Sequence, residues 1–422
     1  MRPALVCVFA LLAAPALADE MGDMPGMHDM PDMAMPAMAS TGVLGPYPMA
    51  RDASGTSWQP DAAPHGGLHL MAGDWMIMAH ASVAGVLDSQ SGPRGDSQAF
   101  AEGWGIVMAR RDFTSGDTLN LRAMLSLDPF MGRRGYPSLL ASGETADGVT
   151  HLVDRQHPHD LLMELSASYS HRLSDDSAVF AYFGYPGEPA LGPTAFMHRA
   201  SSQDVPLAPI SHHWLDSTHI AFGVATLGVV RDDWKLEVSQ FTGREPDQFR
   251  FDAEPARFDS TAVRLSWNPD ENWSLQGSWG FIKSPEQLEP AVNETRYTAS
   301  ATYFTPLAGD GSFAATLAFG RKVLSGGTVQ DAFVAEAEYK PADPWTLFAR
   351  AERIESGELF AGPSPRTVGE ITLGAIHDWR VAGHLKLGLG GLYTFDIVPD
   401  GALPSYGSDP HGAALFVRLL VE

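Results

Sequence analysis

The chain is dominated by long stretches in which every second residue is apolar. In the first of these stretches, the apolar positions are Trp75, Ile77, Ala79, Ala81 and Val83. A period of two is that of a β-strand with one face in an apolar environment. Such stretches run for about nine to eleven residues, longer than the ~5–6 residues common in soluble sheets, and this length matches a tilted strand that crosses a bilayer.

About sixteen such strands are predicted, within a range of 12 to 16. They lie near residues 74–87, 97–110, 117–128, 161–172, 176–186, 217–231, 232–243, 258–268, 272–283, 295–305, 312–323, 330–339, 344–355, 367–379, 383–396 and 412–421. Short connections such as 173–175 alternate with long ones such as 129–160 and 188–215. This alternation is typical of outer-membrane barrels. The sequence therefore predicts an all-β fold, a transmembrane antiparallel β-barrel, over residues 73–422.

Residues 1–18 have the pattern of a secretory signal peptide, with Arg2, an apolar run and the ending Ala16-Leu17-Ala18. The only cysteine, Cys7, lies within this segment, so the mature chain is expected to have no thiolate ligand. A net charge of −23 excludes a basic nucleic-acid-binding protein. We expect an exported protein of the bacterial outer membrane.

The segment that follows, residues 19–72, is predicted to be a disordered tail and linker rich in Met, Pro and Gly. Its candidate metal ligands are Met21, Met24, Met27, His28, Met30, Met33, Met35 and Met38. Thioethers are soft, neutral donors that favour Cu(I), and by the same property Ag(I). We therefore predict a periplasmic tail that binds Cu(I); the alternative is a low-complexity linker that happens to contain methionine.

The non-lipid face of the predicted strands carries charged side chains, which cost ~2–4 kcal/mol in the middle of a bilayer if they are Arg or Lys. These residues are Arg122, Glu164, Lys235, Glu237, Arg264, Glu336, Glu338, Arg350, Glu352, Lys386 and Arg418. They must face a polar interior. Met76, Met78 and His80 share the inward phase. They are predicted as soft metal contacts, with ordinary filling of the lumen as the alternative.

Two of the long loops contain histidines and carboxylates close together. One holds the sequence DRQHPHD with His157 and His159, and the other holds SHHWLD with His212 and His213, preceded by His198 and followed by His219. His157, His159, His212 and His213 are predicted to bind Cu(II) or Zn(II). The alternative is that they hydrogen-bond one another to fold the loops. Neither a nucleophile elbow nor a phosphate-binding loop occurs, so no catalytic residues are predicted.

Several strings resemble those of a family of exported proteobacterial proteins. They are VDRQHPHDLLMELSASYSH (153–171), ISHHWLDSTHIAFG (210–223), SQFTGREPDQFRFD (239–252), DSTAVRLSWNP (259–269) and SPEQLEP (284–290). The resemblance implies an envelope protein whose genes often neighbour copper-efflux or multicopper-oxidase genes, and it supplies no catalytic residues. A Met-rich tail before a barrel also resembles the organisation of the copper-resistance outer-membrane protein CopB.

These features together predict a non-enzymatic outer-membrane barrel in Cu(I)/Ag(I) handling or resistance. The expected partners are outer-membrane lipid, copper ions and a periplasmic copper protein or multicopper oxidase, and copper is expected as cargo rather than as a catalytic cofactor. Two alternatives remain open. One is a general porin or structural barrel without a metal role, and the other is a secreted soluble β-rich metalloenzyme that uses the loop histidines.

Overall fold

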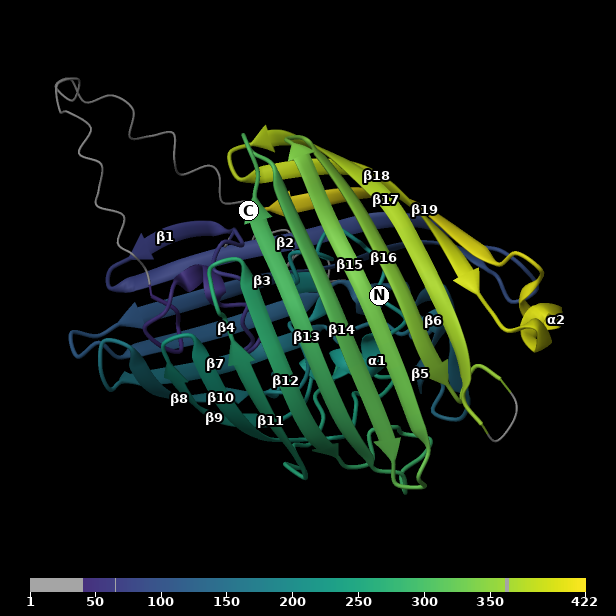
Figure 1. The fold of residues 1–422 in the computed structure, drawn as a ribbon, viewed down its shortest axis with the longest axis horizontal. Coiled ribbons are helices and arrows are strands. Elements are labelled where there is room, and N and C mark those ends of the chain that lie inside the picture. The colour runs from purple at the N-terminus through teal and green to yellow at the C-terminus, as the bar shows by residue number, and fades with distance from the viewer. Residues whose placement is uncertain (1–40, 65, 361–363) are drawn as a thin grey trace, which may run out of the picture. The chain divides into compact units, whose positions relative to one another are not determined.

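The structure, a computed structural model, describes residues 41–64, 66–360 and 364–422. In these residues, one antiparallel sheet of 17 strands contains a closed ring of 16 strands and one additional strand, β1 (Leu68–Ala72). Each strand of the ring pairs with the next one, and the ring closes where β19 pairs with β2 (Figure 1). The predicted transmembrane-type barrel of about sixteen strands is therefore confirmed as the fold.

Every strand of the ring corresponds to one predicted segment. The strands are β2 (Trp75–Gln90), β3 (Ser97–Asp112), β4 (Thr118–Ser126), β7 (Leu162–Arg172), β8 (Ser177–Gly184), β9 (Val224–Arg231), β10 (Trp234–Phe241), β11 (Ser260–Trp267), β12 (Trp273–Ile282), β13 (Glu294–Pro306), β14 (Ser312–Leu324), β15 (Val329–Ala342), β16 (Trp345–Ser356), β17 (Arg366–Ala382), β18 (Leu385–Ile397) and β19 (His411–Val421). The largest difference concerns the segment predicted at 217–231, because β9 begins only at Val224. Residues 217–219 instead form a short 3-10 helix, η4 (Ser217–His219).

The two ends of the ring differ in the length of their connections. One end, here the turn end, has the connections 113–117, 173–176, 232–233, 268–272, 307–311, 343–344 and 383–384. The opposite end, the loop end, includes the long connections 127–161, 185–223 and 242–259. β2 begins and β19 ends at the turn end, as an even number of strands requires. The predicted alternation of short and long connections is confirmed.

The outer surface of the ring is apolar. Along β14, for example, Leu317 is 65% exposed while its neighbours Thr316 and Ala318 are buried. Tryptophans occupy strand ends at the turn end, at Trp75, Trp234, Trp267, Trp273 and Trp345. An apolar band bordered by aromatic residues fits the hydrocarbon layer and the interfaces of a bilayer. No helix in the described residues is long and apolar enough to span a membrane.

The charged residues predicted to face the interior do so. The buried ones are Arg122, Glu164, Lys235, Glu237, Arg264, Glu336, Glu338, Arg350, Glu352 and Arg418. Lys386, near the turn end, is half-buried and pairs with Glu422 at 2.5 Å. Because charges are costly in lipid, their burial requires that the inside of the ring supply their partners.

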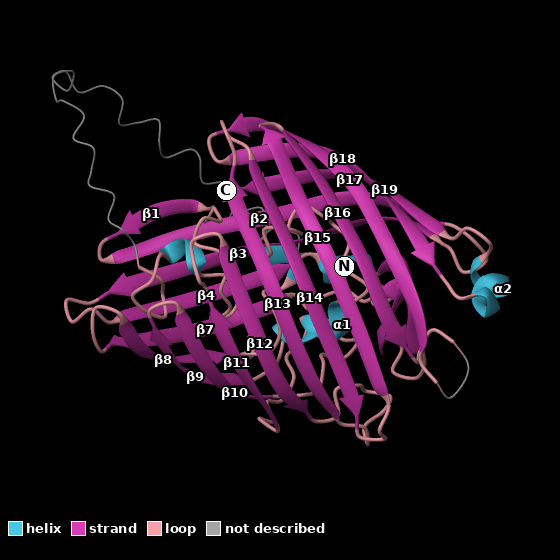
Figure 2. Ribbon diagram, viewed as in Figure 1, coloured by secondary structure: helices cyan, strands magenta, loops and turns pink. Residues whose placement is uncertain are grey.

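Three segments fill the lumen. We call them the N-terminal insert (41–64), the hairpin insert (127–161) and the central insert (185–223). The hairpin insert contains η2 (Asp128–Met131) and the strands β5 (Tyr136–Thr145) and β6 (His151–Gln156), and the central insert contains η3 (Phe196–His198), α1 (His212–Leu215) and η4. Figure 2 shows these short helices enclosed by the strands of the ring. Leu140 and Trp214 pack with Val334 of β15 in one buried cluster. The long loops therefore fold inward.

The prediction that residues 41–72 are a linker is wrong for the N-terminal insert, which is folded into the barrel. Its backbone is buried and bonded to the wall, since Arg122 of β4 donates to the carbonyl of Gly55 at 2.7 Å and Lys235 of β10 donates to that of Thr56. Asp52 accepts from the amide of Val43 at 2.8 Å. The Gly-, Pro- and Ser-rich composition reflects an irregular path whose backbone polar groups are satisfied by inward-facing side chains.

Smaller elements complete the described chain. η1 (Met49–Arg51) lies in the N-terminal insert, and η5 (Asp400–Ala402) and α2 (Leu403–Tyr406) lie in the connection between β18 and β19. The strand β1 pairs with the first residues of β2, beside the turn end. The predicted signal peptide and the tail ligands Met21, Met24, Met27, His28, Met30, Met33, Met35 and Met38 lie outside the described residues.

Candidate metal centre

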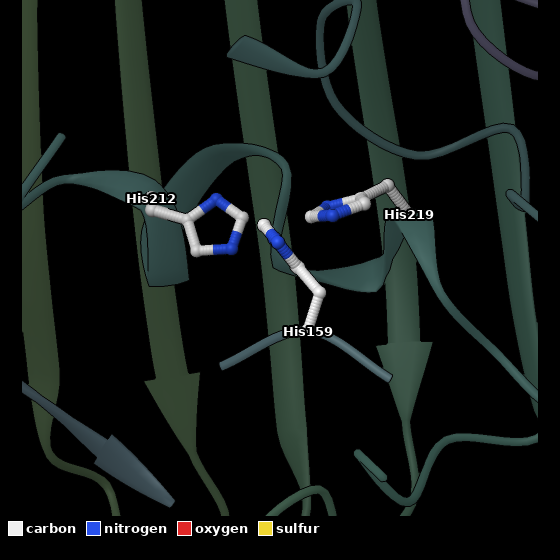
Figure 3. A group of neighbouring side chains, drawn as sticks. All are labelled: His159, His212 and His219. Atoms are coloured by element: carbon white, nitrogen blue, oxygen red, sulfur yellow. The ribbon is translucent and has the colours of Figure 1, made fainter. Parts of the chain in front are cut away.

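Three histidines from two of the inserts meet inside the lumen. His159 follows β6 in the hairpin insert, while His212 begins α1 and His219 ends η4 in the central insert. Each offers one ring nitrogen, and these three atoms all lie within 4.8 Å of one another. Figure 3 shows the three rings gathered around a common point. We call this group the tri-histidine site.

We call Nδ1 of each ring the outer nitrogen and Nε2 the inner nitrogen. Each outer nitrogen has a fixed partner. His219 Nδ1 lies 2.7 Å from the backbone carbonyl of Asp216, and because a carbonyl only accepts, Nδ1 must carry the proton. His212 Nδ1 lies 2.7 Å from Asp216 Oδ1, and His159 Nδ1 lies 2.8 Å from Asp128 Oδ2. In this tautomer the Nε2 atoms carry the lone pairs. Metal-binding histidines are held in the same way, with one ring nitrogen bonded to a carboxylate or carbonyl.

Two of the three inner nitrogens are left without partners. His159 Nε2 and His219 Nε2 are both buried and have no hydrogen-bond partner. Buried polar atoms in folded proteins nearly always have one, so these two nitrogens are available to a ligand. Three imidazole nitrogens that bind one ion at ~2.0–2.1 Å lie about 3.4–3.6 Å apart, so nitrogens that lie within 4.8 Å of one another would have to approach by at most about 1.4 Å to bind it.

Burial keeps the rings of His212 and His219 neutral. Burial lowers the pKa of His212 to about 4 and the pKa of His219 well below its usual range. Burial opposes ionisation of Asp216, but the charge of Arg199 and the hydrogen bond from His212 outweigh it and lower the pKa of Asp216. At neutral pH His212 and His219 are therefore neutral imidazoles beside the ionised carboxylate of Asp216, which is the protonation state that a metal ion requires of these ligands.

Arg199 forms ion pairs with both the tri-histidine site and the wall. Its guanidinium lies 2.6 Å from Asp216 Oδ2 and 2.6 Å from Glu336 Oε1 of β15, and all three side chains are almost wholly buried. On the other side, the ring of Phe196 lies 5.3 Å from that of His212 and 6.2 Å from that of His159, between centroids. The site is thus held rigidly and covered by an aromatic side chain.

The structure brings two of the four predicted loop ligands together in one group. His159 and His212 belong to the tri-histidine site, whereas His157 and His213 do not. The ring of His157 lies 5.3 Å from that of His213, and burial lowers the pKa of His157 well below its usual range. His213 instead joins Glu245 and Glu286 in a second group of possible ligand atoms. His219 was absent from the predicted ligands, although its position seven residues after His212 was visible in the sequence.

Met76, Met78 and His80 face the lumen as predicted, but at the turn end rather than in the tri-histidine site. Met78 and His80 line a cavity of about 160 Å³ together with Met108, Met197 and His198. Met78 and Met76 also border a smaller space beside Met49.

A third cavity, of about 40 Å³, shares lining residues with the larger one. Met197 and Trp104 line both this cavity and the larger one at the turn end. Met163, His157 and His159 also line the third cavity. Thioether and imidazole side chains are therefore among the residues that line both cavities.

Comparisons with known proteins identify the fold. No family model and no curated protein matches the chain. The chain is similar in structure to the anion-selective porin from Comamonas acidovorans, with 10% sequence identity, coverage of 82% of this chain and 99% of the porin, and a TM-score of 0.51. It is also similar to Salmonella typhi OmpF in its complex with daunomycin, with 10% identity, coverage of 84% and 100%, and a TM-score of 0.52. At this identity the likeness concerns the fold, which is that of outer-membrane porins.

Proposed function

We propose that this protein is an outer-membrane barrel that binds copper inside a filled lumen and takes part in copper handling or resistance. The observation that carries the proposal is the tri-histidine site. Its three imidazoles have their outer nitrogens held by Asp128 and Asp216, and two of its inner nitrogens are buried without partners. Imidazole nitrogens suit copper and zinc among the common biological metals.

The soft donors elsewhere in the chain favour copper over zinc. Met78, Met108 and Met197 line the cavity at the turn end, and Met163 lines the space beside His159. Thioethers select Cu(I), whereas zinc has little affinity for them. Thioether ligands bind weakly one at a time, so a Cu(I) ion can pass between neighbouring sets of ligands. The methionines of residues 21–38 are proposed to capture the ion first, on the periplasmic side.

The location and orientation follow from the same physical arguments. The apolar outer surface supports insertion into the outer membrane, and the short connections support a periplasmic turn end. An oxidase or another periplasmic copper protein would then meet the end where the chain enters the barrel. The apolar exterior counts against the alternative of a secreted soluble metalloenzyme, because such a surface would aggregate in water.

A general porin is the second candidate function, and the similarity to porin structures favours it. The three inserts argue against a wide open channel, since they bring buried apolar clusters into the lumen. Single-channel conductance in planar bilayers separates the two. A plain porin shows a large steady conductance that is indifferent to copper, whereas the proposed protein shows little conductance.

Copper titration of the full-length protein in detergent tests the proposal. Wild type is compared with the triple variant His159→Ala/His212→Ala/His219→Ala and with His171→Ala, whose side chain is 55% exposed and pairs with Asp117 outside the lumen. We expect the triple variant to lose one tightly bound copper equivalent and His171→Ala to lose none. A triple variant that is folded and binds as much copper as wild type would refute the proposal.

The tail is tested separately. Deletion of residues 21–38 is expected to remove Cu(I) and Ag(I) equivalents while leaving the tri-histidine equivalent in place. If copper tolerance and Cu(I) binding are both unaltered by the deletion, the tail has no part in capture. That outcome would leave the lumen site standing on its own.

A further inference from the structure

We propose that His213, Glu245 and Glu286 form a second metal site, which binds a divalent cation such as Zn(II) or Cu(II) beside the tri-histidine site. This inference goes beyond the proposed function and does not require the tri-histidine site to be filled. The three side chains come from three different connections at the loop end, 185–223, 242–259 and 283–293. One ligand atom from each lies within 4.8 Å of the others.

Three of the donor atoms of this second site, both ring nitrogens of His213 and one oxygen of Glu245, lack hydrogen-bond partners, whereas Glu245 Oε1 accepts from Ser217 Oγ at 3.1 Å. His213 is 4% exposed, and neither of its ring nitrogens has a hydrogen-bond partner. Its Nδ1 lies 3.6 Å from Glu245 Oε1, beyond hydrogen-bond distance, and Glu245 Oε2 is buried without a partner. A buried imidazole with both nitrogens unpartnered is costly unless a ligand binds it.

The negative charge of the second site also favours the binding of a cation. In the part of the chain that the structure describes, neither Glu245 nor Glu286 has an Arg or Lys within ion-pairing distance. The basic groups whose charge reaches these carboxylates already have another partner, because Arg296 lies 2.6 Å from Glu294 and Lys322 lies 3.8 Å from Glu294. A divalent ion between these carboxylates would offset their repulsion.

The two sites are neighbours with different donor sets. His212 and His213 are consecutive in α1, and their ring centroids lie 5.3 Å apart. The tri-histidine site offers three nitrogens, whereas the second site offers one nitrogen and two carboxylates. Carboxylate oxygens suit harder divalent cations, so the second site excludes Cu(I) more strongly than the first. The lumen would thus hold a pair of metal ions of different character.

The test measures metal content and magnetic coupling in the full-length protein in detergent. Wild type, Glu245→Gln, His213→Gln and Glu289→Gln are loaded with Zn(II) or Cu(II), desalted and analysed for bound metal. Glu289 lies in the same connection as Glu286 but is exposed, so its substitution is the matched control. Unboiled migration on a denaturing gel verifies that each variant is folded.

We expect Glu245→Gln and His213→Gln each to lose one Zn(II) equivalent relative to wild type and Glu289→Gln to lose none. With Cu(II), wild type should show a half-field electron paramagnetic resonance signal from two coupled ions, and Glu245→Gln should show one isolated ion. Folded variants that retain the wild-type metal content would overturn this inference. The variant His159→Ala/His212→Ala/His219→Ala tests the first site independently, so failure of one site is distinguishable from failure of the other.

Discussion

An ion pair in the wall of the barrel and the histidines of the inserts leave their buried polar atoms in different states. In the wall, Arg264 of β11 lies 3.0 Å from Glu237 of β10, and both are almost wholly buried. In the inserts, the inner nitrogens of His159 and His219 have no partner at all. The Arg264–Glu237 pair supplies its own partners, whereas the two imidazole nitrogens are available to a ligand. For these two groups, the comparison assigns stability to the ion pair and ligand binding to the histidines.

Removal of the Arg199 ion pairs, which join the central insert to the wall, should have the largest effect on the free energy of unfolding. Arg199→Met leaves Asp216 and Glu336 buried without their common cation. Removing one partner of a buried charge pair costs about 3–5 kcal/mol. We expect the free energy of unfolding in lipid vesicles to fall by that amount. Arg321→Met removes an exposed pair with Asp331 and should cost less than about 1 kcal/mol, so equal losses in the two variants would contradict the account.

A charge on the lipid face of the wall should destabilise the barrel without touching the inserts. Leu317 lies in the middle of β14 and is 65% exposed. Leu317→Arg is expected to lower the free energy of unfolding in vesicles by about 2–4 kcal/mol, because arginine is costly at the bilayer midplane. Copper binding by the folded fraction should match wild type. An unchanged stability would mean that this face does not contact lipid.

A substitution behind the tri-histidine site should have a smaller effect that is confined to metal binding. Asp128→Asn removes the negative charge that accepts the hydrogen bond from His159 Nδ1. Loss of such an outer partner lowers metal affinity by about 10–100-fold. Copper competition titrations measure this change. Asp147→Asn, at an exposed turn of the same insert, is the control and should leave the affinity unchanged.

The smallest effect on stability is expected from the replacement of a methionine by leucine at the turn end. Met78→Leu conserves volume, so the free energy of unfolding should change by less than about 1.5 kcal/mol. Ag(I) binding should nevertheless weaken, because the thioether that lines the cavity is lost. Met124→Leu, which is buried without lining these cavities, is the control. Equal Ag(I) binding in all three proteins would assign Met78 to packing alone.

The wall could be predicted from the sequence because lipid outside and polar groups inside impose a strict period of two. Leu317 and Thr316 obey this rule as neighbours on β14, one exposed and the other buried. The same rule explains why the strand predicted at 217–231 begins too early. Residues 217–223 directly precede an alternating stretch and are included in the prediction, but β9 begins at Val224 and His219 belongs to the central insert.

The inserts could not be predicted, because no periodic pattern governs an irregular segment inside a lumen. The composition of residues 41–64 resembles that of a linker, yet Tyr47 and Trp58 pack against Val230 of β9 in a buried cluster. The strands β5 and β6 were missed for the same reason. The loop histidines were recognised by type, but their grouping depends on folding that brings two distant connections together.

The most direct test of the central claim is a crystal structure of the copper-loaded full-length protein, with anomalous diffraction measured at the copper edge. The account predicts an anomalous peak among the Nε2 atoms of His159, His212 and His219, about 2 Å from each. A folded, copper-saturated protein with no peak there, or with those nitrogens turned away from one another, would contradict it.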